Sequence, residues 1–502
     1  MKYALISGSI LLFICFVLWF DRPRSPIHAV LFAGDLTGTK VLCVSLCIAT
    51  ILLCILPMSL SPIWNGRIPT YRNQYELMAD SILDGRLYFD YEVDEKLLEM
   101  ENPYDTEARE ALDVDYHWDH AFYNGKYWMY FGIVPEFLLF IPFKLLTGVS
   151  LPAYHATQIF TAGFIIGFFL LFAFLAKRFF PHMTKALYLL GSISFSIVSI
   201  WFTVPGPAMY CTAISGALCL EIWSLFLFLK AVYDAPSEKR ALAMAHLGAL
   251  CGALSFGCRP PVALGNVILL PLIFAFLKNG RSGKHTLRKF AVIALPYAIV
   301  GALLMLYNYV RFDNPFEFGQ SYQLTVTDQS AYGNFFAQVD IGNIGEFLWF
   351  YLFNIPFSLD APSFGIFVTC PILLISGFML FDKGTRQFLK ERRIFPLIPA
   401  AIAGALFIIA FDATASPCPL PRYHMDFDWL ISIAAFLLIA AGGELVVEKD
   451  RKKYSALVSV LCCVSVLTCT LMFFIPYDRN FMDYYAPESV EIFKKIISFG
   501  LL

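Results

Sequence analysis

The chain has 502 residues, of which 58% are hydrophobic and only 15% are charged. Because an average soluble domain carries roughly 25% charged residues, this composition excludes an ordinary water-soluble globule. No long basic run or basic patch interleaved with aromatic residues appears beside the net charge of -2, so nothing in the sequence indicates binding to nucleic acid.

Apolar stretches long enough to cross a bilayer recur from one end of the chain to the other. A transmembrane helix needs about 20 predominantly apolar residues. Candidate spans lie near 4–20, 41–60, 154–176, 184–203, 209–229, 242–258, 260–277, 289–308, 363–381, 395–411, 427–445 and 455–475. Residues 1–20 resemble a signal peptide but show no clear small-residue cleavage site, so we expect a retained first span. The sequence predicts an all-α, polytopic bundle of about 12 spans that forms a single integral membrane domain over 1–502.

Lysine and arginine gather in five loops, which indicates the orientation because cytoplasmic loops are enriched in these residues. The loops lie at 177–185, 230–240, 278–289, 383–393 and 449–453. All five fall on one side only if two proline-containing apolar segments, 132–148 and 344–357, do not cross the bilayer. We therefore expect both segments to be interfacial or re-entrant on the outer side.

This orientation places three long segments outside: an extracytoplasmic loop at 61–153 with juxtamembrane helices, a second extracytoplasmic loop at 309–362, and an extracytoplasmic tail at 476–502. The end of the tail has apolar residues on one face and resembles an interfacial amphipathic helix. These outer segments hold nearly all the unusual polar chemistry, so we expect a multi-pass plasma-membrane protein whose active site faces outside.

The densest acidic cluster lies in the run DVDYHWDHAFYNGKY, where Asp113, Asp115 and Asp119 alternate with His117 and His120. Carboxylates this close can share a metal or shift each other's pKa, after which one can act as a base toward a sugar or lipid hydroxyl. The alternative is a solvated acidic loop. Asp119 stands out because aromatic residues surround it in the sequence, namely Trp118, Phe122, Tyr123 and Tyr127.

Three arginines lie at the outer ends of predicted spans: Arg259 in CRPP, Arg311 in YNYVRF and Arg422 in PRYHMDFDW. Each can extend to the interface as a structural residue, or hold a phosphate with its planar five-donor group. Arg422 and Asp426, four residues apart, can also form a helix-end ion pair. Three cations at the mouth of one bundle suit a polyanionic lipid headgroup.

Glu221 lies inside the apolar run MYCTAISGALCLEIWSLF. An ionisable residue at membrane depth is a functional candidate, but its depth favours a structural hydrogen bond or a pathway role over catalysis.

The whole layout resembles the GT-C superfamily of membrane glycosyltransferases, which use polyprenyl-phosphate sugars as donors and include protein mannosyltransferases and the lipid A aminoarabinose transferase. The resemblance rests on a span followed by a large outer loop and on a set of similar stretches. They are YRNQYELMADSILDGRLY, YNGKYWMYFGIVPEFLLFIPFKLLTG, LSFGCRPP, YNYVRFDNPFEFGQSYQLT and PRYHMDFDWL, the last three being similar to uncharacterised bacterial members.

The sequence departs from this family where its members usually place an acidic pair or an aspartate, just after the span that precedes the large loop. This chain has Tyr71, Arg72, Asn73 and Gln74 there, and Tyr130 and Phe131 replace the Glu-Lys of the aminoarabinose transferases. These departures argue against aminoarabinose transfer. They make Asp119 the expected catalytic base, with Asp115 and Asp80 as reserves.

The resemblance implies sugar transfer from a polyprenyl-phosphate donor to a glycan, lipid or protein acceptor at the outer face of a bacterial plasma (inner) membrane. The donor phosphate is expected to contact Arg259, Arg311 and Arg422, with Tyr423, Lys126 and Tyr322 as further candidates for substrate or phosphate binding. A divalent metal is compatible with this chemistry, although no ligand set is assigned. Two alternatives stay open: a lipid-linked-sugar transporter or flippase, and a non-catalytic envelope-assembly protein on the same fold.

Overall fold

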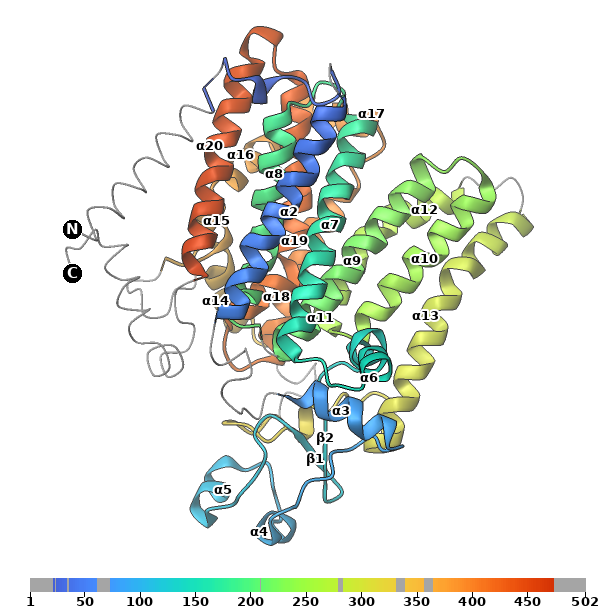
Figure 1. Cartoon of the computed structure of the whole chain (residues 1–502), viewed down its shortest axis with the longest axis vertical. Helices are drawn as coiled ribbons and strands as arrows, with labels where there is room; N and C mark the ends of the chain where they lie inside the picture. Colours follow the sequence, from blue (N-terminus) through green and yellow to red (C-terminus); the bar gives the residue numbers. More distant parts are fainter. Residues whose placement is uncertain are drawn as a thin grey trace, which may run out of the picture.

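The protein is a helical bundle with a small irregular layer at one end, as seen in a computed structural model (Figure 1). The structure describes residues 21–22, 24–33, 36–60, 73–207, 209–278, 283–330, 339–355 and 364–473. The predicted first span at 4–20 and the tail at 476–502 lie outside these residues.

Nine helical segments of the described ranges are long and apolar enough to cross a membrane. They contain α2 (Leu36–Leu60), α7 (Ala153–Phe179), α8 (Lys185–Ile200), α9 (Met209–Tyr233), α12 (Leu270–Lys278), α13 (Gly283–Phe312), α18 (Leu397–Ala415), α19 (His424–Leu445) and α20 (Glu448–Met472). Short turns lengthen three of them: η3 (Trp201–Thr203) after α8, α11 (Pro260–Ala263) and η4 (Leu264–Leu269) before α12, and η7 (Pro421–Tyr423) before α19. The predicted multi-pass α-helical architecture is thus confirmed.

Two further predicted spans are helical, but neither forms one continuous, entirely apolar helix. Residues 242–258 form most of α10 (Glu238–Phe256), which begins with charged residues. The described residues of the predicted span at 363–381 form two helices, α15 (Ile366–Thr369) and α16 (Ile372–Phe381). The break falls at Pro371 because proline has no N–H to continue the hydrogen-bond ladder.

The bundle has a protein-enclosed centre and a lipid-accessible edge. In the most apolar window of the α19 span 94% of the residues are buried inside the protein, whereas the share is 17% for the α2 and α13 spans. Small residues let the central helices approach closely: a side chain at Gly167 of α7 would meet Ile222 of α9 at 2.7 Å. Phe172 of α7 stacks on Phe436 of α19 with 3.5 Å between ring centroids. Helix α19 therefore forms the core, and α2 and α13 form its outside.

The described residues of the five basic loops lie toward one end of the bundle, the upper end in Figure 1, where α17 (Lys383–Glu391) also lies. Contacts between loops fix this arrangement: Arg392 donates to the carbonyl oxygen of Phe179, Tyr233 to that of Arg393, His182 pairs with Glu444, and His285 pairs with Glu238. The clustering on which the predicted orientation depends is present. Which side of the membrane this end faces stays a prediction.

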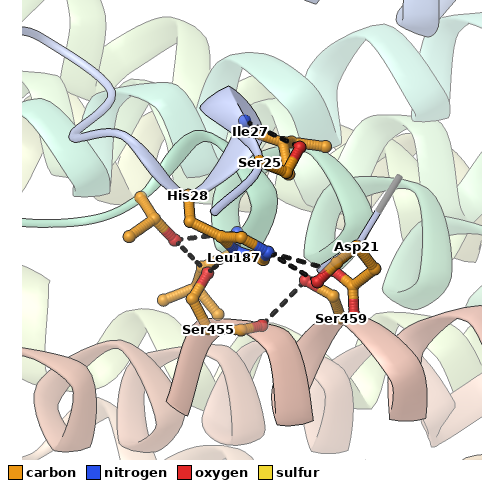
Figure 2. A network of polar contacts seen from close by, with 8 residues as sticks. Asp21, Ser25, Ile27, His28, Leu187, Ser455 and Ser459 are labelled. Carbon is orange, nitrogen blue, oxygen red and sulfur yellow. Dashed lines mark hydrogen bonds and ion pairs between the residues drawn. The ribbon is translucent and has the colours of Figure 1, made fainter. Parts of the chain in front are cut away.

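A buried polar network at the same end fastens the segment before α2 to the bundle (Figure 2). His28, at the end of η1 (Pro26–His28), has Nδ1 2.8 Å from Oγ of Ser455 and Nε2 2.9 Å from the carbonyl oxygen of Asp21. Oγ of Ser455 also lies 2.8 Å from the hydroxyl of Thr184 on the other side. Burial raises the pKa of Asp21 to about 6. The network joins residues 21–28 to α20 and to the start of α8.

The opposite end carries the loop predicted to lie outside, called the outer loop below. Its described part, which starts at residue 73, contains short elements: α3 (Gln74–Leu83), α4 (Glu95–Glu99), α5 (Thr106–Leu112), β1 (Ala121–Tyr123) and β2 (Lys126–Trp128). The two strands form an antiparallel hairpin with Ala121 opposite Trp128. Asn124 and Gly125 make its turn with φ of 52° and 69°, since Asn-Gly tolerates the positive φ that a two-residue hairpin requires.

The two segments predicted not to cross the membrane are short helices. Residues 132–148 contain a π-helical turn, η2 (Glu136–Phe140), followed by α6 (Ile141–Thr147), which lies beside α3 at the end of the bundle (Figure 1). Residues 341–353 form α14 (Ile341–Phe353), which packs on α18. Neither reaches the roughly 20 residues that a span needs, while residues 356–357 of the second segment lie outside the described ranges.

Candidate functional site

A cavity of about 450 Å³ lies where the outer loop meets the ends of the membrane helices. Its walls combine residues that are far apart in the sequence. The lining residues come from 118–119, 130–133, Tyr210, 256–261, 304–311, 318–329, 411–418 and 420–423. Not every residue within these ranges lines the cavity. The cavity volume falls in the range of small-molecule sites.

Asp119 lines this cavity and is held in place through both its backbone and its side chain. The residue is 5% exposed and has a φ of 62°, in the left-handed region that Asp tolerates better than most residues. Its N–H donates to the carbonyl oxygen of Leu324 at 2.8 Å, and its own carbonyl accepts from Nε2 of Gln74 at 2.9 Å. Gln323 donates to its carboxylate Oδ1. A left-handed, tightly held and buried acid is the kind of residue that clusters at functional sites.

His120, the next residue, faces away from the cavity and supports the turn. Its Nδ1 lies 2.7 Å from the carbonyl oxygen of Trp118, to which it donates in the tautomer that suits this contact. Burial lowers the pKa of His120 to about 4, so the ring is neutral near pH 7. Its Nε2 has no hydrogen-bond partner among the described residues.

Arg259 lines the cavity but has a carboxylate partner. Its Nε and Nη2 donate to Oδ1 and Oδ2 of Asp426, both at 2.7 Å. The guanidinium carbon also lies 5.0 Å from the centre of the Tyr423 ring. Asp426 thus takes its bidentate ion pair from Arg259, rather than from Arg422 four residues earlier.

Close backbone packing holds the turn that precedes Arg259. The N–H of Val134 donates to the carbonyl oxygen of Gly257 at 2.9 Å. A Cβ at Gly132 would lie 2.1 Å from the carbonyl oxygen of Cys258, so this position accommodates only glycine without backbone movement. The segment 132–134 therefore fixes one wall of the cavity against the end of α10.

Arg311, at the end of α13, lines the cavity as a cation without a carboxylate partner. It is 4% exposed and donates from Nη1 to the carbonyl oxygen of Met129 at 2.5 Å and from Nη2 to Oδ1 of Asn308 at 2.8 Å. Its guanidinium carbon lies 3.8 Å from the centre of the Tyr307 ring. Within the described ranges no ion pair involves Arg311, and its Nε has no hydrogen-bond partner. A buried charge of this kind is stabilised by a bound anion.

Arg422 and Tyr423 complete the basic wall from η7. The guanidinium carbon of Arg422 lies 4.5 Å from the centre of the Tyr210 ring, and both η7 residues line the cavity. The three arginines singled out in the sequence therefore lie around one cavity together with Asp119.

The other sequence candidates lie elsewhere in the outer layer. Asp80 pairs with Lys144, and the N–H of Asp115 donates to Asp94 in the exposed part of the loop. Lys126 lies 4.2 Å from the centre of the Tyr88 ring, and Tyr322 packs on Tyr123 with 4.6 Å between centroids. None of these four predicted site residues lines the cavity, namely Asp80, Asp115, Lys126 and Tyr322.

Glu221 is fully buried in α9, away from the cavity lining. Its Oε1 accepts hydrogen bonds from Ser255 and from Nδ2 of Asn266. These bonds join α9, α10 and η4, which agrees with the structural alternative considered for this residue.

The acidic run of the outer loop does not gather into a metal-binding cluster. In the described ranges no three side chains of His, Cys, Asp or Glu come together in a way that would hold an ion. Asp113 instead ends α5 with a left-handed φ of 49°, and the His117 ring packs 4.0 Å from that of Tyr91.

Asp412 is a cavity residue that the sequence analysis did not single out. It lies in the last turn of α18, is 2% exposed, and has one carboxyl oxygen, Oδ2, without a hydrogen-bond partner among the described residues. The available signal was its position directly after the apolar run FIIAF, where an acidic residue at membrane depth is a functional candidate.

The fold is similar to that of the archaeal oligosaccharyltransferase AglB from Archaeoglobus fulgidus, whose structure was solved in complex with an inhibitory peptide and a dolichol-phosphate. The similarity has a TM-score of 0.50 at 14% sequence identity and covers 93% of this chain and 60% of that one. The chain thus spans less than two thirds of the length of AglB. No protein-family model and no curated protein matches the sequence. The likeness confirms the GT-C-type fold that the sequence resemblance implies.

Proposed function

Starting from this GT-C-type fold, we propose that the protein transfers a sugar from a polyprenyl-phosphate donor to an envelope lipid, glycan or protein acceptor at the outer face of a bacterial plasma membrane. The observation that carries the proposal is the shared cavity: Arg259, Arg311 and Arg422 line it together with Asp119. Cations suit the phosphate of such a donor, and a carboxylate suits the hydroxyl group of an acceptor.

Arg311 is better placed than Arg259 to bind the donor phosphate. In the reaction the bond between the sugar carbon and the phosphate oxygen breaks, and the lipid phosphate leaves with the electron pair. A cation that stabilises this developing charge lowers the barrier. Arg259 already shares its charge with Asp426, whereas Arg311 has no ion pair in the described ranges. Arg311 therefore supplies more of the compensating charge than Arg259, which shapes the wall.

Asp119 is proposed as the general base. It takes the proton of the acceptor hydroxyl while the acceptor oxygen forms the new bond to the sugar carbon. Gln323 holds one carboxylate oxygen, which fixes the direction of the other. The side chain of Gln74, from the stretch where relatives usually carry an acidic residue, donates to the Asp119 backbone. Asp119 is thus adjacent to that position in space, which supports its taking over the missing acidic role.

The neighbourhood of the cavity suits a lipid substrate. Leu304 and Tyr307 of α13 belong to the lining, while Leu303 and Leu306 of the same helix are 59% and 58% exposed on the outside of the bundle. A prenyl tail in the membrane beside α13 would therefore reach the arginines with its phosphate.

The burial of Asp119 in the same cavity as the arginines favours catalysis over the non-catalytic assembly alternative, which an exposed Asp119 far from the arginines would have strengthened. For the transporter alternative, the distinguishing property is net movement of the lipid-linked sugar without transfer. That property is measured in the same experiment.

The test compares cells with and without the gene by mass spectrometry of envelope glycans and lipid-linked sugars. We expect the knockout to lose one sugar from an envelope component and to accumulate the matching polyprenyl-phosphate sugar. Restoring the gene should reverse both changes, and a gene carrying Asp119→Asn should restore neither. In the same cells, labelling with a membrane-impermeant reagent reports the leaflet that holds the accumulated lipid-linked sugar. Accumulated donor in the outer leaflet supports transfer, whereas accumulated donor confined to the inner leaflet would favour a flippase. Unchanged envelope sugars and unchanged lipid-linked sugars would contradict transfer.

A further inference from the structure

A second carboxyl group reaches the cavity from α18, at Asp412. It is almost fully buried, and its Oδ2 has no hydrogen-bond partner among the described residues. Leaving a buried polar oxygen without a partner costs about 1–3 kcal/mol. Each such group in a native protein therefore needs an explanation, and a bound ligand is one.

Asp412 differs from the two other buried aspartates nearby in α19. Asp426 accepts two hydrogen bonds from Arg259, and an oxygen of Asp428 lies 3.3 Å from Nδ1 of His424. Within the described ranges no ion pair involves Asp412. The structure therefore satisfies two of these acids internally and leaves part of the third for the contents of the cavity.

The cavity around Asp412 is rich in neutral hydrogen-bonding groups and aromatic rings. Gln320 is joined to the end of α18, since its Nε2 donates to the carbonyl oxygen of Ala415 at 2.8 Å. The lining also contains amide and hydroxyl side chains and aromatic rings, namely Gln329, Thr325, Thr327, Ser416, Trp118 and Tyr130. Amides, hydroxyls and a carboxyl group form hydrogen bonds with the many hydroxyl groups of a sugar, and rings cover its apolar faces.

We infer that Asp412 determines sugar specificity: its unpartnered carboxyl oxygen forms a hydrogen bond with hydroxyl groups of the donor sugar while the arginines hold the phosphate. This inference rests on the proposed function and adds to it a residue that recognises the sugar. Asp412 takes no part in the proton transfer that we assign to Asp119. Its contribution therefore concerns which lipid-linked sugar is bound, and it is absent for the sugar-free lipid phosphate.

The test measures binding of two kinds of probe to purified full-length protein. The first kind is the bare lipid, undecaprenyl phosphate. The second kind is the same lipid linked to glucose, mannose, galactose or N-acetylglucosamine. Asp412→Asn keeps the shape of the side chain and part of its hydrogen-bonding capacity, whereas Asp412→Val removes the hydrogen-bonding capacity of the side chain completely. Thr414→Val is the matched control, because Thr414 is buried in the same helix and bonds only to its own helix, at the Phe411 carbonyl oxygen.

All four proteins should bind undecaprenyl phosphate with the same affinity, which also shows that the variants are folded. The wild type and Thr414→Val should prefer at least one sugar-linked lipid over the bare lipid. That preference should fall about 10- to 100-fold in Asp412→Val, as expected when sugar hydroxyl groups lose their hydrogen-bond partner in a buried site, and less in Asp412→Asn.

An unchanged preference in Asp412→Val, or an equal loss of affinity for bare and sugar-linked lipids, would overturn the inference while leaving the proposed function in place. A wild-type protein that binds none of the lipids would instead contradict the proposed function itself. A wild type that binds the bare lipid as tightly as every sugar-linked probe would overturn the inference, since no sugar is then recognised.

Discussion

Arg259 and Asp426, 167 positions apart in the sequence, form a bidentate ion pair with both N–O distances at 2.7 Å. The pair joins the turn after α10 to the first turn of α19. Asp426 is fully buried. Such a pair fixes the geometry of the cavity wall strongly, because removing one partner leaves the other charge buried without compensation.

Replacing Asp426 with asparagine should therefore destabilise the fold by about 3–5 kcal/mol. Thermal unfolding in detergent, followed by circular dichroism, measures this change. The matched control is Asp450→Asn, since Asp450 pairs with Lys453 at the surface, where an ion pair contributes at most about 1 kcal/mol. Equal stability of the two variants would contradict the structural role assigned to the pair.

A second prediction separates Arg311 from an ordinary positive charge. Arg311→Lys keeps the charge but loses the planar fork that binds phosphate oxygens in pairs. The affinity for undecaprenyl phosphate should fall about 10- to 100-fold, measured by ligand titration on purified protein. Arg86→Lys serves as the control, because Arg86 pairs with Asp84 and Asp90 outside the cavity. If Arg311→Lys binds the lipid as tightly as Arg86→Lys does, Arg311 is not a phosphate ligand.

A third prediction concerns pH. His120 has a pKa of about 4 in the folded protein against its usual 6.5, so the unfolded chain binds more protons than the folded one between these values. Stability contributed by the neutral ring is thus fully present above pH 6.5 and is lost as the pH falls toward 4. The full loss amounts to about 3 kcal/mol. Thermal unfolding at pH 7, 6 and 5 should show a steeper decline for the wild type than for His120→Gln; parallel declines would contradict it.

A fourth prediction tests the orientation. With Cys418, an exposed cysteine of the described ranges, changed to serine, Val149→Cys should react with a membrane-impermeant maleimide in intact cells, since Val149 is 59% exposed beside α6. Lys239→Cys, at the basic end, should react only after lysis. The reverse pattern would place the cavity on the inner side and remove the basis for an outer-face reaction.

Much of the fold could be predicted from hydropathy alone, because lipid exposure demands long apolar helices. The one-sided count of basic loops predicted that 132–148 does not cross, although a run of apolar residues there suggests a span; the short elements η2 and α6 agree with this prediction. The break at Pro371 and the polar start of α10 were harder to predict, since packing against neighbouring helices lets a short or charged helix lie inside the bundle.

The site could be predicted only in part. Arg259, Arg311 and Arg422 stood out because three arginines at the outer ends of predicted spans suit a polyanionic headgroup, and Asp119 because of its aromatic neighbours. Asp412 escaped notice because it follows an apolar run and resembles any helix-end residue. The spacing of Arg422 and Asp426 allowed an ion pair between them, and only tertiary packing reveals that Arg259 is the bidentate partner of Asp426.

The most direct test of the account is transfer by Asp119→Asn, measured in parallel with donor binding on purified protein. Asparagine has nearly the size of aspartate but cannot accept the acceptor proton. The account predicts that Asp119→Asn binds the polyprenyl-phosphate sugar normally and transfers it about 10²- to 10⁴-fold more slowly. Asp115→Asn and Asp80→Asn, whose carboxylates lie outside the cavity, should transfer at the wild-type rate. Near-normal transfer by Asp119→Asn, with collapse in either control, would contradict the assignment of the cavity as the place where the sugar is transferred.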